Sequence, residues 1–147
     1  MIVHHVVSHS KQSLLKTYIL LFTAESVISK RWYNKNMEYV TYEEFKKMDM
    51  RVGTIKEVEP VPDTDKLLKF MIDFGDPELR QIVSGIREFY PEYEKLIGKQ
   101  VLYIVNLEPR MIKGIESQGM LMAVDGIDGK PVFLTPEVEV SAGARVR

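Results

Sequence analysis

The chain has 147 residues, a formal net charge of −1 and no cysteine, so it fits one domain of ordinary size and excludes disulfides and thiolate metal sites. Its charge is uneven: residues 1–36 carry five Lys/Arg and one Glu, a net of +4, whereas residues 37–147 carry fifteen Lys/Arg and twenty Asp/Glu, a net of −5. A nucleic-acid partner therefore needs a local basic patch, because the main part of the chain repels polyanions.

Residues 1–36 differ from the rest of the chain in composition and in the pattern of apolar and charged residues. The apolar run Leu14–Phe22 contains Lys16 and is too short to cross a bilayer. Four of the five cations lie within or after that run, unlike the pattern of a signal peptide. Two interpretations stay open: translation starts at Met37 and the preceding segment is an upstream artefact, or residues 10–28 form an amphipathic helix that extends the domain.

The first elements after this segment are a short helix and a long strand. Thr41 and Glu44 have the spacing of a capping box, which predicts a helix through to about Met48. Residues 49–58 read as a strand, and Gly53 inside it predicts a bend or bulge of the kind that a small barrel needs.

Three further strands and a second short helix follow. Residues 68–74 alternate between apolar and polar side chains, which predicts a half-buried strand. Residues 80–84 form a third strand. Residues 91–96 are expected to be a short helix closed by Gly98. Residues 101–105 are apolar on both faces, as in a central strand.

The rest of the chain is expected to hold a long loop and a hairpin. Residues 106–118 form the loop, rich in hydrogen-bond donors, and residues 119–124 form the next strand. Two Asp-Gly pairs, at 125–126 and 128–129, are hairpin signals before a strand at 131–134. Residues 138–147 contain one more possible strand.

These elements predict an all-β fold with short helices: an OB-type, five-stranded Greek-key barrel, with an N-terminal helical extension at 1–36 left open. The alternative is a different small barrel or a sandwich. In an OB barrel, the loops after the first strand and between the fourth and fifth strands flank the ligand face. Those loops are residues 59–66 and 106–118, so the donor-rich loop falls at the expected binding site.

Catalytic and metal-binding chemistry is poorly represented. All three histidines, His4, His5 and His9, lie in the N-terminal segment, and the i,i+4 pair among them lacks a third ligand. From residue 37 onward there is neither His nor Cys, which excludes nucleophilic triads and most transition-metal sites. We therefore expect no catalytic residues, no metal and no cofactor, and an enzyme is the weaker class.

The two loops carry residues suited to a nucleic acid, namely cations for phosphate, amide and hydroxyl donors, and an apolar face for a base. They are Lys66, Arg110 and Lys113; Asn106, Ser117 and Gln118; and Met120. Each has a structural alternative. Asn106 and Ser117 could satisfy loop backbone groups, Met120 could be core, and Lys66 could pair with a neighbouring Asp.

The segment NLEPRMIKGIESQGM at 106–120 fits the pattern N-L-x-P-R-x-x-x-G-x-x-S-x-G-M. It resembles the tRNA-binding OB domain of methionyl-tRNA synthetases, which occurs at their C-terminus, as their separate β subunit and as free-standing tRNA-binding proteins. Blocks at 49–55, 62–68, 80–86 and 98–107 match the same family in the same order. The resemblance covers about residues 42–147.

The resemblance implies a cytoplasmic, non-catalytic homodimer that binds tRNA by shape, uses its C-terminal segment at the dimer interface and raises a synthetase's hold on tRNA. A methionyl-tRNA synthetase catalytic subunit would be its partner, and a membrane would not. The residues carried over onto the motif are Asn106, Arg110, Lys113, Ser117, Gln118, Met120, Lys66, Arg80 and Ser84. Arg80 could instead be a strand-edge charge.

Three residues depart from the family pattern: Val61, Glu108 and Ala142, where His, a basic or neutral residue, and Pro are frequent. Glu108 and Glu116 also dilute the basic character of the 106–118 loop. The alternative function is an export-related, peptide-binding chaperone of the same fold, which shares the IDFG-like strand at 72–75.

Overall fold

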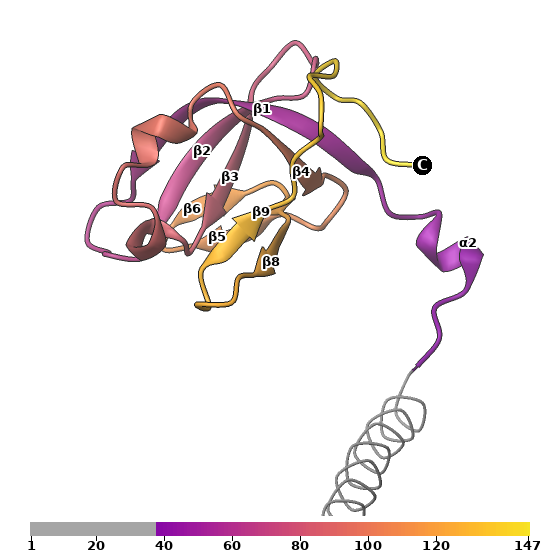
Figure 1. Ribbon diagram of the computed structural model, residues 1–147, viewed down its shortest axis with the longest axis horizontal. Helices are drawn as coiled ribbons and strands as arrows, with labels where there is room; N and C mark the ends of the chain where they lie inside the picture. The colour runs from indigo at the N-terminus through magenta and orange to yellow at the C-terminus, as the bar shows by residue number, and fades with distance from the viewer. Residues whose placement is uncertain (1–37) are drawn as a thin grey trace, which may run out of the picture. The chain divides into compact units, whose positions relative to one another are not determined.

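Residues 38–147 are described in the computed structural model, and a β-barrel occupies Tyr42–Arg147 (Figure 1). The predicted helix at 10–28, the histidine pair and the domain assignment of 1–36 lie outside the described residues. The described elements are α2 (Tyr42–Phe45), β1 (Met50–Pro60), β2 (Leu68–Asp73), β3 (Arg80–Ser84), η1 (Arg87–Phe89), η2 (Tyr93–Leu96), β4 (Gln100–Ile104), β5 (Arg110–Ile112), β6 (Ile115–Ser117), β7 (Met120–Leu121), β8 (Ala123–Asp125) and β9 (Pro131–Phe133).

Five antiparallel strands form the barrel sheet, in the order β3-β2-β1-β4-β7. The long strand β1 pairs with β4 through its first half and with β2 through its second half. The first three strands form a meander and β4 returns beside β1, which is Greek-key order. This arrangement confirms the predicted OB-type barrel.

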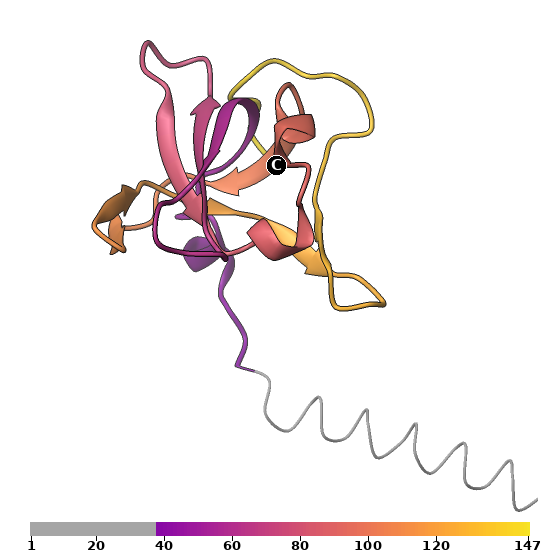
Figure 2. The same ribbon diagram turned by 90° about the vertical axis from the view of Figure 1, so that its left-hand side faces the viewer.

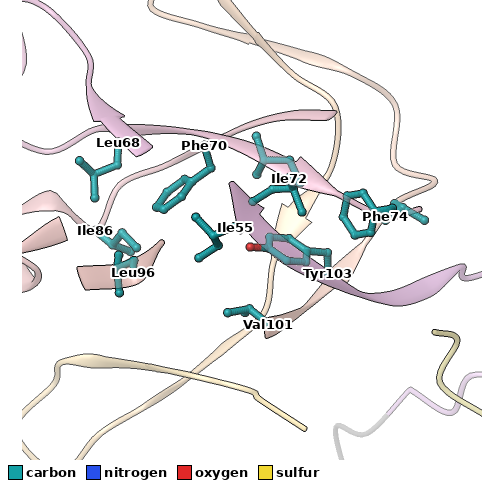
Figure 3. Packing of buried hydrophobic residues seen from close by; sticks show 11 residues of the cluster. Ile55, Leu68, Phe70, Ile72, Phe74, Ile86, Leu96, Val101 and Tyr103 are labelled. Carbon is teal, nitrogen blue, oxygen red and sulfur yellow. The ribbon is translucent and has the colours of Figure 1, made fainter. Parts of the chain in front are cut away.

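The barrel core follows from the alternation seen in the sequence. Every second residue of β2 is buried, and these side chains meet the inward-facing residues of β1, β3 and β4 (Figure 3). The Phe74 and Tyr103 rings pack edge to face with centroids 5.3 Å apart. Leu96 of η2 joins the same cluster. Burying a side chain of this size stabilises the fold by about 1.5–3 kcal/mol.

Gly53 does not mark the irregularity that the sequence predicted at its position. The register of β1 against β2 shifts further along the strand, between Ile55 and Glu57. Gly53 is required for packing instead: a Cβ there would lie 2.6 Å from the Phe74 ring and would overlap the side chain of Ile72. The long first strand therefore bends by a bulge beyond the glycine.

Three other predictions need correction. The predicted 106–118 loop contains an antiparallel hairpin, β5–β6, which projects at the left of Figure 2. The strand predicted at 119–124 is split into β7, which belongs to the barrel, and β8, which pairs with β9. The helix predicted at 91–96 is a 3-10 turn over Tyr93–Leu96, followed as expected by a left-handed Gly98 (φ 85°).

The C-terminal segment lies along the outer edge of the first half of β1. It makes one isolated bridge, Arg51 with Arg145, in place of the predicted strand. Backbone hydrogen bonds join Val52 to Gly143 and Ala144 at 2.8 Å. Gly143 has φ 80°, and a Cβ there would overlap the carbonyl oxygen of Phe74. The segment thus covers a strand edge that would otherwise be open. No helix within residues 38–147 is long and apolar enough to span a membrane.

Candidate nucleic-acid interface

A pocket of about 170 Å³ lies between β3, β7 and the β5–β6 hairpin, and we call it the hairpin pocket. It is lined by Val83, Ser84, Leu107, Glu108, Arg110, Ile112, Ser117, Gly119, Met120 and Leu121. Four of the nine predicted site residues are therefore brought together here: Ser84, Arg110, Ser117 and Met120. Met120 is half exposed, so it is not a core residue.

The hairpin presents two of the predicted cations. Arg110 stands at its base, opposite Ser117, and Ile112 pairs with Ile115 across the turn. The turn residues Lys113 and Gly114 have φ of 51° and 79°, as a type I′ turn requires. Arg110 and Lys113 are both exposed. The hairpin therefore holds one cation beside the pocket and one at its tip.

Ser117 and Gln118 join the two edges of the barrel sheet. The backbone N–H of Val83 donates to the Ser117 hydroxyl at 3.0 Å, and Ser117 is buried. The backbone N–H of Gln118 donates to the Gln81 carbonyl at 2.9 Å, and its side-chain oxygen accepts from the Gln81 N–H at 3.2 Å. Both side chains thus close the barrel between β3 and the β6–β7 segment.

Asn106 ties the end of β4 to the segment before β1. Its side-chain oxygen accepts from the Asp49 backbone N–H at 2.8 Å, and its amide nitrogen donates to the Lys47 carbonyl at 2.5 Å. These contacts agree with the structural alternative for Asn106, in which its side chain satisfies loop backbone groups. Its amide is therefore engaged with backbone groups on both sides.

Arg80 does not line the hairpin pocket. Its guanidinium donates to the Val105 carbonyl at 2.7 Å, lies 3.5 Å from the Asp76 carboxylate and covers the Phe74 ring at 5.3 Å. Together with Gln118 it lines a second depression beside residues 76–79. Its charge is partly buried and already neutralised.

Lys66 lies in the β1–β2 loop, residues 61–67, which is joined to the end of β3. Leu68 pairs with Ser84, a residue of the hairpin pocket. The Arg87 backbone N–H donates to the Lys66 carbonyl at 3.0 Å, and its guanidinium donates to the Thr64 carbonyl at 2.6 Å. Arg87 is a cation of this region that the sequence reasoning missed. The sequence feature that could have pointed to Arg87 is its position directly after the block at 80–86, which matches the family.

The cations on the hairpin, on the β1–β2 loop and after β3 differ from most other cations of the described chain in having no ion-pair partner. Ion pairs neutralise these cations of the described chain: Lys46, Arg51, Lys56, Lys69, Arg80, Lys95 and Arg145. Four cations on the β1–β2 loop, after β3 and on the hairpin form no ion pair with any described residue: Lys66, Arg87, Arg110 and Lys113. Lys47, Lys99, Lys130 and Arg147 are likewise unpaired within residues 38–147 but belong to other elements.

Six acidic residues of the described chain are ion-pair partners of these cations: Glu43, Asp49, Glu59, Asp73, Asp76 and Glu92. Asp49 bonds the Arg51 guanidinium at 2.6 Å, and this hydrogen bond holds the pKa of its carboxyl below its usual value. A backbone hydrogen bond from Gly75, and then Lys56, lower the pKa of Asp73. Within residues 38–147, no group of three or more acidic or imidazole side chains is arranged to hold a metal ion.

The family model described as "Putative tRNA binding domain" matches residues 50–145, about two thirds of the chain. The chain belongs to this family. It is 49% identical over 114 residues to the methionine–tRNA ligase of Thermococcus kodakarensis, covering 77% of this chain and 15% of that protein. The corresponding ligase of Pyrococcus horikoshii is 41% identical and covers 95% of this chain and 20% of its own length. The chain thus spans about a fifth or less of these two relatives.

Two solved structures share the barrel. The methionyl-tRNA-synthetase-related protein of Pyrococcus horikoshii is 43% identical, covers 76% of this chain and all of its own, and superposes with a TM-score of 0.69. The chaperone CsaA of Bacillus anthracis is 28% identical, covers 75% of this chain and all of its own, and gives a TM-score of 0.66. The tRNA-binding resemblance is therefore shown, and a chaperone fold is a structural neighbour.

Proposed function

We propose that this protein is a non-catalytic, structure-specific tRNA-binding protein that acts as, or beside, a methionyl-tRNA synthetase β subunit. It would raise the synthetase's hold on tRNA, in the cytoplasm. The observation that supports the proposal is a group of four cations on the hairpin, on the β1–β2 loop and after β3: Arg110, Lys113, Lys66 and Arg87. Arg110 lines the hairpin pocket, and none of the four forms an ion pair with a described residue, whereas seven other cations of residues 38–147 are paired. Unpaired cations release counterions from a polyanion on binding, and this supplies affinity.

Within this proposal the nine predicted residues have two kinds of role. Arg110, Lys113 and Lys66 contact phosphates, and Ser84 and Met120 contact sugar or base. Arg87 holds the β1–β2 loop through the Thr64 carbonyl and adds an unpaired charge beside Lys66. Asn106, Ser117, Gln118 and Arg80 hold the loops and the barrel closure that position them, because their polar groups already have partners within the protein.

Fluorescence anisotropy with labelled tRNA across a salt series tests this function. We expect affinity to fall as salt rises, and R110A/K113A to reduce the slope of log K against log salt by about 1–2. K47A/K99A removes two charges from exposed residues outside the pocket that, like Arg110 and Lys113, form no ion pair with a described residue, and it should leave both quantities nearly unchanged. No binding at low salt, or binding by R110A/K113A that equals the wild type, rejects the assignment.

The remaining parts of the proposal concern assembly. We propose a homodimer whose interface includes residues 138–147, where Val138 is 69% exposed and Val146 is 44% exposed. Sedimentation equilibrium of the full chain and of V138D/V146D should give a dimer and a monomer, respectively. Addition of the protein to a methionyl-tRNA synthetase catalytic subunit should lower the KM for tRNA. An unchanged KM would remove the accessory role.

A peptide-binding, chaperone-like function is the second candidate. It is supported by the CsaA neighbour and by the apolar character of the hairpin pocket, where Leu107 and Met120 are 42% and 45% exposed. Competition between tRNA and an unfolded model peptide distinguishes the two. A peptide that binds in the absence of any tRNA binding would favour this candidate.

A further inference from the structure

Glu108 is out of place in a site for a polyanion. It lines the hairpin pocket together with Arg110, and its side chain is exposed. Its carboxylate forms no ion pair with any residue of the described chain. If the pocket met only phosphates, this charge would weaken binding. Its position calls for a ligand group that a carboxylate can bind.

The pocket has the size and lining for a single aromatic ring. Its volume is about 170 Å³, and an apolar cavity of roughly 150 Å³ is known to admit a ring the size of benzene. Its apolar walls are Val83, Leu107, Ile112, Met120 and Leu121. Sequence-specific RNA recognition mainly targets unstacked bases, which are hydrogen-bonded at their edges and stacked on aromatic rings or an Arg guanidinium plane. Among the described residues, the hairpin pocket has no aromatic ring, so its aliphatic walls would contact the face of a base and Arg110 is its guanidinium.

We propose that the hairpin pocket takes one unstacked nucleobase, with Glu108 accepting a hydrogen bond from the base's exocyclic amino group and Arg110 holding the adjacent phosphate. This inference rests on the proposed function and specifies it. Carboxylates accept from the amino group of cytosine in known base recognition. Uracil has the same ring size but presents a carbonyl there, which a carboxylate repels. The pocket therefore prefers cytosine to uracil.

Charge favours a base of a nucleic acid over an apolar side chain of a peptide. The pocket opens beside Arg110, on the hairpin that carries Lys113, and Ser84 connects it to the loop that carries Lys66. A neutral apolar peptide gains nothing from these unpaired cations. A base linked to a phosphate uses both the apolar walls and the cation beside them.

The test uses the full chain and two labelled oligonucleotides of equal length, oligocytidine and oligouridine, titrated by anisotropy at one salt concentration with tRNA in parallel. We expect oligocytidine to bind about three- to tenfold more tightly, the value of one net hydrogen bond. E108A should bring this ratio close to one, and it should raise oligouridine affinity because a repulsive charge is lost. E116A removes the same charge from the same hairpin but not from the pocket lining, so it should keep the ratio.

Each result bears on the inference. Equal wild-type affinities, or a ratio that survives E108A, overturn it. Binding of tRNA without binding of either oligonucleotide overturns it as well, while the proposed function stands. Loss of all three rejects both. If neither oligonucleotide binds and an unfolded model peptide displaces tRNA, the pocket takes peptide and the inference is overturned.

Discussion

The Val83 backbone N–H donates a hydrogen bond to the Ser117 hydroxyl at 3.0 Å, and this contact joins two strands that are 34 residues apart. The hydroxyl in turn donates to the Gly119 carbonyl at 3.2 Å. Ser117 stands at the end of β6, beside the hairpin pocket, so one buried side chain completes the barrel and shapes the base of the candidate interface. Stability and binding are therefore linked at this residue.

Replacing Ser117 with Ala should destabilise the protein by about 1–3 kcal/mol, because the Val83 N–H is then left unsatisfied in a buried place. Urea unfolding of the full chain measures the loss. S141A is the control: Ser141 is exposed and should change stability by less than about 0.5 kcal/mol. A stable S117A variant with weakened tRNA binding would instead mean that the hydroxyl contacts RNA directly.

Asn106 should behave as a tether. N106D keeps an oxygen for the Asp49 N–H but cannot donate to the Lys47 carbonyl, whereas N106A loses both contacts. We expect N106A to lose about 1–2 kcal/mol of stability and N106D to lose at least as much, because its carboxylate oxygen would face the Lys47 carbonyl oxygen. Hydrogen exchange at the Asp49 amide should accelerate in N106A. An unchanged exchange rate would contradict the tether.

These two residues show why the site was harder to predict than the barrel. The alternation of residues 68–74 reflects local geometry, so β2 could be placed closely from the sequence alone. The partners of Ser117, Gln118, Asn106 and Arg80 are backbone groups 25 to 59 residues away. A donor that bonds distant backbone and a donor that bonds RNA have the same appearance in a sequence.

The hairpin was missed for a local reason. A two-residue type I′ turn is usually signalled by Asn-Gly or Asp-Gly, and here the first position is Lys113. The turn therefore read as part of an irregular loop. Arg87 was missed because its importance depends on Thr64 and Lys66, which the fold alone brings beside it.

Gly143 should be intolerant of any side chain. In G143A the new Cβ meets the Phe74 carbonyl in a backbone conformation with φ 80°, so we expect a loss of more than about 2 kcal/mol. Gly129 is a matched control: its φ is 76°, but nothing lies within 4 Å of the added Cβ. G129A should cost only the conformational strain, about 1 kcal/mol. Equal losses in thermal unfolding would mean that the C-terminal segment does not pack on Phe74.

Acid should weaken the fold partly through Asp49. The Arg51 hydrogen bond lowers the folded-state pKa of this carboxyl, and Arg145 also approaches it at 3.6 Å. A lowered folded-state pKa gives stability that is present above the unfolded pKa of about 3.9 and is lost as pH falls through the folded value. The free energy of unfolding should therefore decline below about pH 4. D49N should flatten this decline, and an unchanged acid slope in D49N would contradict the assignment.

Replacing Lys113 should have opposite effects on the stability of the protein and on its affinity for tRNA. A lysine at φ 51° bears a cost of about 1 kcal/mol that Asn largely avoids, and Asn-Gly is the favoured type I′ pair. K113N should therefore raise the free energy of unfolding by about 0.5–1 kcal/mol. It should also weaken tRNA binding and reduce the salt slope by about 1, because a phosphate contact is lost. K99N removes a charge from an exposed residue outside the hairpin pocket and should leave binding unchanged.

If K113N gains stability but binds tRNA as the wild type does, the tip of the hairpin does not touch the RNA. If it loses stability, the turn is not of this type. The expected combination, a firmer hairpin with weaker binding, would mean that the lysine is kept at a strained position for its charge.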